Sequence, residues 1–495
     1  MLRYTATPEA SCHQSRAAMA KTQYTAGLHF IVKTSDQRLT EKDRKAAVSH
    51  ASRTRWKLRK ERCMRSWIDP DRCLRGEKRA IALDAPKRSL PSLRLVGGTF
   101  SATELPPGIE PGMIQELGKL IDMDKVGVYP YEICLQVHPV QRGWFPCMIS
   151  DLCCVHSMMF SVRAFVDGMT RGGRISHLAA FHYDQTLQLL QGRINAFERG
   201  LGDEICGDST IMVIITLATA AELGDDLATA QIHLDGLQRI VSLRGGLRRL
   251  GTHTNLQVKV CRADLSLALR SGIRPRLFHD EIEWDCYIAD RGLVRCSHVQ
   301  NDTTIRPFVD GLDPKLRNCW KDMHAFSCLS NLAYQTTRKM SPETYNQMMI
   351  SILYRLTHLS FENDASQEAI RVALLNFCAT LFLTRCYFDQ PYERLSELYN
   401  ATLVNCCQVS SEPFPKPIMF WLVMLYHVVT GEPTSSGTVR FDKEFSPAQV
   451  DTWEEAHAIL RSIMWIDFVH GNRGREIFET VVRETITRNS LEMKE

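Results

Sequence analysis

Residues 209–250 read STIMVIITLATAAELGDDLATAQIHLDGLQRIVSLRGGLRRL, and this stretch carries the strongest local pattern in the chain. In its second half, apolar residues recur at the three- and four-residue intervals of one helix face: Leu227, Ala230, Leu234, Leu237 and Val241. Asp225 and Asp226 precede this face, where carboxylates cap free amide groups, and a Gly-Gly pair follows it, where glycine ends a helix. The first half, 211–223, is apolar on all sides, which predicts a buried helix. Together the halves predict a helical hairpin.

Helical spacing continues on both sides of this hairpin, and strand alternation of useful length is absent from the sequence. Residues 273–312 are the main interruption and are expected to form an irregular loop. A chain of 495 residues is also too long for one hydrophobic core, so more than one sub-core is expected. The predicted fold class is all-α, a multi-helix domain of packed helical hairpins. Its further predicted helices are 147–166, 177–201, 256–271, 316–332, 342–359, 365–388, 393–407, 418–429, 448–468 and 474–488.

The composition fits a globular protein rather than a membrane or disulfide-rich one. Hydrophobic residues make up 44% and charged residues 23% of the chain. Apolar runs stay below the roughly 18 to 20 residues that a membrane span needs, so no membrane partner is expected. The 17 cysteines are odd in number and have no regular framework, which indicates reduced thiols inside a cell.

The charge is divided unevenly along the chain. Residues 33–94 hold 19 Lys and Arg against 8 Asp and Glu, a net charge of +11, so the rest of the chain, within a total of +4, carries −7. Residues 40–68 are predicted to form a basic helix without an apolar face, and 69–112 are rich in proline and read as a linker. Residues 1–112 are therefore expected to be a basic, partly disordered N-terminal arm, and residues 113–490 a helical domain.

The basic helix of this arm is the main functional signal. Clustered Lys and Arg side chains meet phosphates and release counterions, which gives salt-dependent affinity for nucleic acid. A nuclear import signal or a merely solvated charged helix has the same composition, so these alternatives stay open. The candidate residues are Arg53, Arg55, Lys57, Arg59, Lys60, Arg62 and Arg65.

Two groups of cysteine and histidine are candidates for metal binding. Structural zinc sites use closely spaced pairs such as C-x2-C, and this chain contains none. Cysteines in an apolar helix behave as small hydrophobic residues, so the first group is expected in the core. No metal or cofactor is expected at either group. The first comprises His138, Cys147, Cys153, Cys154 and His156, and the second Cys286, Cys296 and His298.

Motifs of catalysis are also missing. The sequence GMIQELGK at 112–119 is one residue too long for a phosphate-binding loop, and Leu120 replaces the metal-binding hydroxyl. Neither G-x-G-x-x-G nor G-x-S-x-G occurs. His233 lies at the edge of an apolar stripe, where a hydrogen-bonded structural histidine is expected rather than a general base. No catalytic residue is assigned, and the chain is not expected to be an enzyme.

Three stretches resemble the regulatory domain of fungal-specific transcription factors. The first is HLDGLQRIVSLRGGL, which is similar to that family's A-x-x-H-x-x-G-L helix and R-G-G turn. KVCRADLSLALRSGIRPRLF at 259–278 is similar to its next helix and proline-containing turn, and 30–60 to the basic stretch ahead of the helical body. A looser match at 463–478 includes Trp465, Asp467 and His470. The residues that carry the first match are Ala230, His233, Gly236, Leu237, Arg244, Gly245 and Gly246.

The resemblance implies an all-helical regulatory module of a nuclear transcriptional regulator, with partners in the transcription machinery. Family members that bind DNA directly usually use a zinc cluster that opens with C-x2-C-x6-C, and this chain lacks that motif. Zinc and sequence-specific recognition are therefore not carried over. Either the DNA-binding part is missing from this polypeptide or the basic arm serves instead. The alternative is a helical scaffold that shares the fold without binding DNA.

Overall fold

The computed structural model describes most of the chain after residue 148. The described residues are 107–109, 113, 117, 131, 134–135, 149–170, 175–250, 255–278, 282–292, 305–384, 392–409, 414–430, 450 and 452–480. Within them the regular secondary structure is helical, and one isolated bridge pairs Leu135 with Met340, which confirms the all-α fold class. None of these helices is both long and apolar enough to cross a bilayer. The predicted arm helix and its seven basic residues lie outside the described residues.

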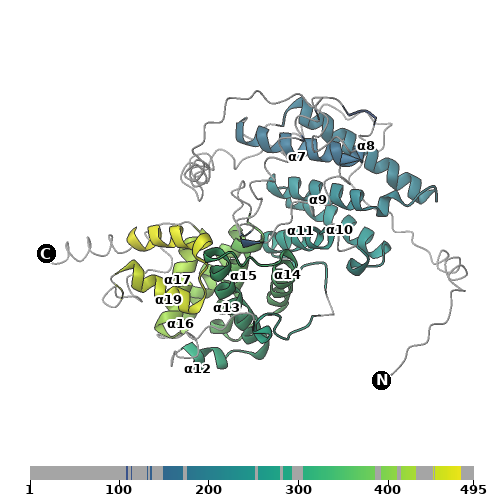
Figure 1. Cartoon of the computed structure of the whole chain (residues 1–495). Helices are drawn as coiled ribbons and strands as arrows, with labels where there is room; N and C mark the ends of the chain where they lie inside the picture. The colour runs from purple at the N-terminus through teal and green to yellow at the C-terminus, as the bar shows by residue number, and fades with distance from the viewer. Residues whose placement is uncertain are drawn as a thin grey trace, which may run out of the picture.

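The helices follow one another along the chain, and Figure 1 shows their arrangement. Short 3-10 turns lie at η2 (Glu204–Cys206), η3 (Leu247–Arg249) and η4 (Ala289–Arg291), and η6 (Asp467–Gly471) is a π-helical turn that continues into a helix at 472–480. The α-helices are α7 (Leu152–Thr170), α8 (His177–Glu198), α9 (Asp208–Leu223), α10 (Leu227–Leu243), α11 (Leu256–Ser271), α12 (Ile305–Asp310), α13 (Pro314–Gln335), α14 (Pro342–His358), α15 (Ala365–Phe382), α16 (Glu393–Val409), α17 (Lys416–Thr430) and α19 (Trp453–Ile463).

The first core lies between two hairpins. Helices α7 and α8 pack on each other, α9 packs on α10, and α7 also packs on α9. Helix α9 is the central arm, because its residues from Thr210 to Ile215 are buried without interruption, as its all-round apolar sequence predicts. Helix α10 buries the predicted stripe and leaves Asp235 and Arg239 exposed. The predicted hairpin is confirmed.

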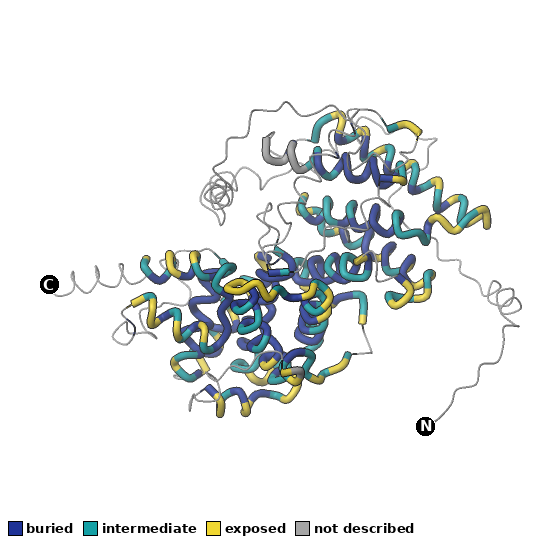
Figure 2. Tube along the Cα trace, in the orientation of Figure 1, coloured by how far each residue is buried: buried dark blue, intermediate teal, exposed yellow. Residues whose placement is uncertain are grey.

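The second core is larger and gathers the helices from α12 to α19. Helices α15 and α17 run through its middle and are dark along nearly their whole length in Figure 2. Trp320, Trp421 and Trp465 are fully buried there. The indole N–H of Trp421 donates to the Met464 carbonyl at 2.7 Å, so a large ring enters this core with its polar atom satisfied.

Helix α11 belongs to both cores. Its predicted apolar face packs into the first core, and a second face, formed by Cys261, Leu265 and Leu269, packs into the second core. It contacts α9 and α10 on one side and α14 and α16 on the other. The expectation of more than one sub-core is confirmed, and the sub-cores share one helix. The face in the first core comprises Leu256, Val260, Ala263 and Leu267.

Several predicted helix starts coincide with side-chain caps. The side chains of Ser176, Asp226 and Ser341 each accept a hydrogen bond from a backbone N–H in the first turn of α8, α10 and α14. Asp225 has a different role from the predicted cap. It adopts a left-handed backbone with φ of 63°, and its carboxylate receives Arg270 at 3.2 Å.

Two expectations about helix extent were wrong. The predicted helix 448–468 ends at Ile463, and Met464 and Ile466 adopt extended backbone before the π-helical turn. The predicted irregular region 273–312 contains helix α12, in which Ile305 and Val309 are buried. Both differences arise from contacts with distant parts of the chain, which local periodicity does not encode.

Candidate functional site

The family-like hairpin places its motif residues in the core and at the end of α10. His233, Gly236 and Leu237 are buried on the side of α10 that faces the first core. Arg244 follows the helix and reaches the start of α9, where its guanidinium forms an ion pair with Asp208 and donates to the Cys206 carbonyl at 3.4 Å. Arg244 therefore joins the two ends of the hairpin that lie farthest from its connecting loop.

The two motif glycines form the turn that ends α10. Gly245 and Gly246 have φ of 94° and 88°, values that side chains with a Cβ rarely adopt. The N–H of Gly245 donates to the Ser242 carbonyl at 3.0 Å, and that of Gly246 to the Val241 carbonyl at 2.9 Å. This pair of bonds is a Schellman motif, which satisfies carbonyls at the helix end. The R-G-G sequence is thus explained by turn geometry.

His233 is buried as predicted, but it is not hydrogen-bonded as predicted. Among the described residues, no group lies within hydrogen-bonding distance of its Nδ1. Burial lowers the pKa of His233 to about 4, against a weaker opposing effect of Asp226. The ring is therefore neutral at physiological pH. Its neighbour Asp235 points away and pairs with Arg276 at 2.6 Å, so the two do not form an acid–base pair.

The second family-like stretch forms α11 and the turn that follows it. Asp264 is buried in α11, and its carboxylate accepts the backbone N–H groups of Arg276 and Leu277 at 2.8 and 3.1 Å. The Tyr354 hydroxyl of α14 donates to the same carboxylate at 2.8 Å. Burial raises the pKa of Asp264, and these donors oppose the rise only in part. The aspartate thus fixes the proline-containing turn and ties it to the second core.

A second polar contact crosses the joint between the cores at α11. The Ser266 hydroxyl donates to the buried Glu222 carboxylate of α9 at 2.6 Å and lies 3.1 Å from the Tyr392 hydroxyl, which precedes α16. Gly272 ends α11 with φ of 71°, and a Cβ there would meet the Arg394 side chain at 2.0 Å. These contacts fix α11 rather than form an open site.

The loosely matching third stretch also has a structural explanation. His470 is fully buried, with its Nε2 2.9 Å from the Thr380 hydroxyl, and burial lowers its pKa to about 3. Asp467 accepts from His457 at 2.8 Å on the surface. Trp465 lies fully buried beside Gly474, where a Cβ would meet its ring at 2.5 Å.

Two sets of polar side chains, on opposite sides of α13, were missed from the sequence. Asp322 accepts the backbone N–H groups of residues 287–289 and pairs with the Arg355 guanidinium at 2.6 Å. Farther along the same helix, His324, Ser327 and Asn331 contact the backbone of residues 463–467. Polar residues repeating at helical spacing among Cys319, Met323 and Phe326 were the available signal. Asp322 lies on one side of α13, and the polar face on the opposite side comprises His324, Ser327, Cys328 and Asn331. Together they hold two irregular segments in place.

The first group of metal candidates lies in the core, as predicted, where the structure describes it. Cys153 and Cys154 are buried in the first core and donate to backbone carbonyls, Cys153 to Thr186 and Cys154 to Ser209. His156 lies with its Nδ1 2.9 Å from the Nδ1 of His182. Within the described residues, no three possible ligands gather around one point. Cys286 donates to the Asn318 carbonyl, and His138, Cys147, Cys296 and His298 lie outside those residues.

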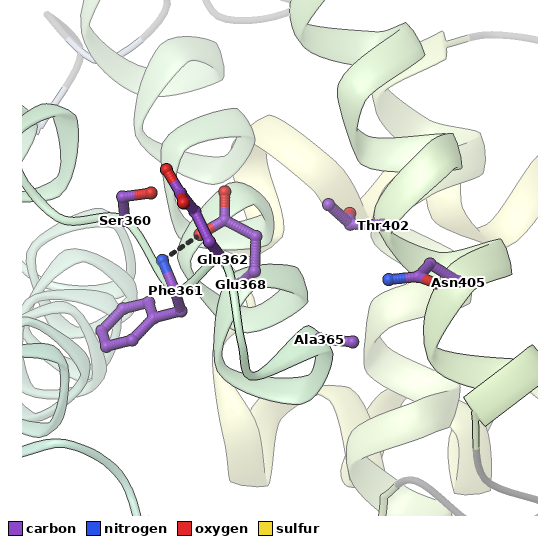
Figure 3. Close-up of a pocket in the computed structure, with 7 residues that line it drawn as sticks. All are labelled: Ser360, Phe361, Glu362, Ala365, Glu368, Thr402 and Asn405. Carbon is purple, nitrogen blue, oxygen red and sulfur yellow. Dashed lines mark hydrogen bonds between the residues drawn. The ribbon is translucent and has the colours of Figure 1, made fainter.

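A small surface hollow lies between the start of α15 and α16 (Figure 3). Its volume is about 120 Å³, below the roughly 300 to 1,000 Å³ of ordinary ligand pockets. Thr402 and Asn405 line it from α16, and Glu362 and Glu368 from the other side. The Glu368 carboxylate already accepts from Arg371 at 2.8 Å and from the Phe361 N–H at 3.1 Å. The hollow is therefore a poor candidate for chemistry.

Comparison of the chain with protein families, with curated proteins and with solved structures gave no match.

Proposed function

We propose that this protein is a non-enzymatic transcriptional regulator of the nucleus, similar to fungal-specific transcription factors but without their zinc cluster in this chain. Its helical body would bind protein partners of the transcription machinery. The arm that contains Arg53 to Arg65 would supply nuclear import or weak DNA affinity. The main support is that four family-like residues have a defined architectural role: Arg244 and the two glycines close the α9–α10 hairpin, and Asp264 fixes the turn after α11.

These roles support the resemblance because they involve the least replaceable features of the motif. A left-handed glycine pair and a buried aspartate with two backbone donors are not interchangeable with other residues of similar hydropathy. A chance match in an amphipathic helix would reproduce the apolar spacing but would have no reason to reproduce these turn-forming residues. The motif therefore supports the proposed fold rather than an active site. The proposed function would be carried by the surfaces of the helical body.

The charge division supports the role of the arm. The +11 of residues 33–94 opposes the −7 of the remaining chain, so the segment that meets an anionic partner is separated from the body that would repel it. Each phosphate contact lowers the logarithm of the binding constant by about 0.9 per tenfold rise in salt on duplex DNA. Seven contacts would give a slope of about −6.

The test compares the full-length chain with a variant in which the seven basic arm residues are replaced by glutamine. Nuclear accumulation and DNA binding across a salt series are measured for both. The proposal expects nuclear wild type, a steep salt slope, and the loss of one or both in the variant. A control, R248Q/R249Q/R338Q, removes exposed charge from the body and should leave localisation and slope unchanged.

Cytosolic wild type without salt-sensitive DNA affinity would contradict the proposal. The helical scaffold is then tested directly by co-purification from native extract and by promoter occupancy. A stable protein partner together with no promoter occupancy would favour the scaffold. The regulator and the scaffold are therefore distinguished by the localisation of the protein in the cell and by the protein partners that it binds without DNA.

A further inference from the structure

Cys328 and His324 form a thiol–imidazole pair on the polar face of α13. The Cys328 Sγ lies 3.8 Å from His324 Nε2, one helical turn away. Cys328 is partly exposed, whereas His324 is buried. A reagent from solvent therefore meets the thiol first, with the ring behind it.

The second ring nitrogen of His324 fixes which tautomer is present. His324 Nδ1 lies 2.5 Å from the Ile463 carbonyl oxygen, across 139 residues of sequence. A carbonyl oxygen only accepts, so Nδ1 carries the proton and donates. In the neutral ring, Nε2 is then the basic nitrogen, and it is the atom that faces the thiol. Reactive cysteines are generally activated by an adjacent base, and a third group holds that base in the right orientation. Cys328, His324 and the Ile463 carbonyl have this arrangement.

The chain that follows Ile463 is held by two other side chains of α13. Ser327 Oγ donates to the Trp465 carbonyl and accepts the Trp465 N–H, both at 3.0 Å. Asn331 donates to the same carbonyl at 2.7 Å and accepts the Asp467 N–H at 2.9 Å. Four hydrogen bonds from two side chains one helix turn apart therefore fix residues 465–467, which directly follow the segment that orients the His324 ring.

Other cysteines of the described chain are placed differently. Burial raises the pKa of Cys134, Cys153 and Cys319 to about 12 and that of Cys406 to about 11. Two partly exposed cysteines also have raised pKa values: Cys206, through burial and Asp203, and Cys286, to about 11, through burial and nearby carboxylates. A thiol with a raised pKa is a poor nucleophile at neutral pH. Cys206 and Cys286 thus serve as internal references of similar exposure.

We propose that Cys328 is a site of oxidation by hydrogen peroxide, with His324 as its base. The Cys328 thiol gives its proton to His324 Nε2, and the thiolate sulfur attacks one peroxide oxygen. The S–O bond forms as the O–O bond breaks, and the departing hydroxide takes the proton from His324 and leaves as water. Sulfur loses two electrons and peroxide gains them, which yields the sulfenic acid.

The test treats native full-length protein with low hydrogen peroxide in the presence of dimedone, which traps sulfenic acids, and follows each cysteine by mass spectrometry. Labelling of Cys328 should exceed that of Cys206 and Cys286 by about tenfold or more. In urea the three sites should become equivalent, because the pair no longer exists. Equal labelling of Cys328, Cys206 and Cys286 in the native protein would overturn the proposal. So would a ratio of Cys328 labelling to that of the other two cysteines that stays the same in urea.

His324→Asn separates activation from structure. The asparagine amide can still donate to the Ile463 carbonyl, but the base that faces the thiol is gone. Cys328 labelling should fall about tenfold or more in this variant, with Cys206, Cys286 and the melting temperature nearly unchanged. Unchanged Cys328 labelling in a folded H324N protein would overturn the role of His324.

Discussion

Helices α10, of 17 residues, and α13, of 22 residues, are specified in different ways. Helix α10 begins at the Asp226 cap and ends at the Gly245–Gly246 turn, and the ion pair of Arg244 closes it against α9 a few turns away. Helix α13 also begins with a local cap, at Asp313, but its buried polar face contacts backbone up to 139 residues away.

The difference shows what each kind of residue contributes. The cap, the glycine turn and the ion pair of α10 all join residues within about 40 positions of one another. The hairpin could therefore be predicted from the sequence. The buried polar side chains of α13 instead satisfy backbone groups of residues 287–289, through Asp322, and of residues 463–467, which lack helical or strand partners of their own. If this comparison is correct, variants on α13 cost more than variants at the ends of α10.

The largest effect is expected for Asp322→Ala. This change leaves the Arg355 guanidinium, only 1% exposed, without its carboxylate and removes the acceptor of three backbone N–H groups. Loss of one partner of a buried ion pair costs about 3 to 5 kcal/mol. Urea denaturation measures it, with D310A as the control, because Asp310 is 57% exposed and pairs with Arg306 at 3.8 Å. Equal stability of the two variants would contradict the anchoring role of α13.

Asn331→Ala should have the next largest effect. It leaves the partly buried Asp467 N–H without an acceptor and removes one donor from the buried Trp465 carbonyl. An unsatisfied buried group costs about 1 to 3 kcal/mol, so a loss near the upper end, about 2 to 3 kcal/mol, is expected. The matched control is N195A, whose amide oxygen accepts from Gln191 on the exposed side of α8 and whose loss should cost less than about 0.5 kcal/mol. Thermal unfolding that shifts equally in both would refute the distinction.

His233→Leu tests the histidine of α10, whose protonation state depends on its burial in the tertiary structure. Its folded pKa of about 4 lies below the unfolded value of about 6.5. Between these pH values the unfolded chain takes up a proton and the folded chain does not, so wild-type stability falls as pH decreases from about 6.5 to 4. At pH 5 the loss is about 2 kcal/mol.

The leucine variant should lack this loss, so the difference in unfolding free energy between variant and wild type should shift by about 2 kcal/mol in favour of the variant between pH 7.5 and pH 5. Urea denaturation at the two pH values measures the shift. His177 is exposed at the start of α8, and H177Q should keep the wild-type pH dependence. A parallel pH dependence for H233L and wild type would show that His233 titrates normally.

The smallest effect is expected at the end of α10. Gly245→Ala forces a Cβ into a backbone with φ of 94° and places it 3.2 Å from the Arg249 side chain, so a loss of about 1 to 2 kcal/mol is expected. Gly192 lies inside α8 with open space around it, and G192A should stabilise by about 0.5 to 1 kcal/mol. Thermal unfolding should therefore move in opposite directions for the two glycines. Shifts of the same sign would remove the turn explanation of the R-G-G motif.

Much of the helical framework was predictable because its signals are local. The cap of Ser176, the Ser341-Pro342 start of α14 and the two faces of the α9–α10 hairpin depend on residues within one or two turns. The predicted helix through 464–466 failed because the α13 side chains that satisfy this segment as extended chain lie more than 130 residues away. The hydrogen bond predicted for His233 failed for the same reason, since a partner is a property of the packed state.

The candidate sites also differ in whether they depend on local or on distant residues. The pattern at His233, Arg244 and the glycines was visible, and the structure explains it by packing and turn geometry. The Cys328–His324 pair was not singled out, although its spacing of four places both side chains on one helix face. Its chemistry depends on the Ile463 carbonyl, which fixes the tautomer of His324 and which no local pattern connects to α13.

By itself the sequence determined the fold class, the hairpin at 209–250 and the uneven charge of the chain, because periodicity, caps, glycine turns and charge are properties of neighbouring residues. Only the tertiary structure decided that α11 serves two cores, that α13 holds two irregular segments and that one thiol faces a histidine of fixed tautomer. The physical reason is that buried backbone groups must find partners wherever the packed chain supplies them, and those partners are distant in sequence.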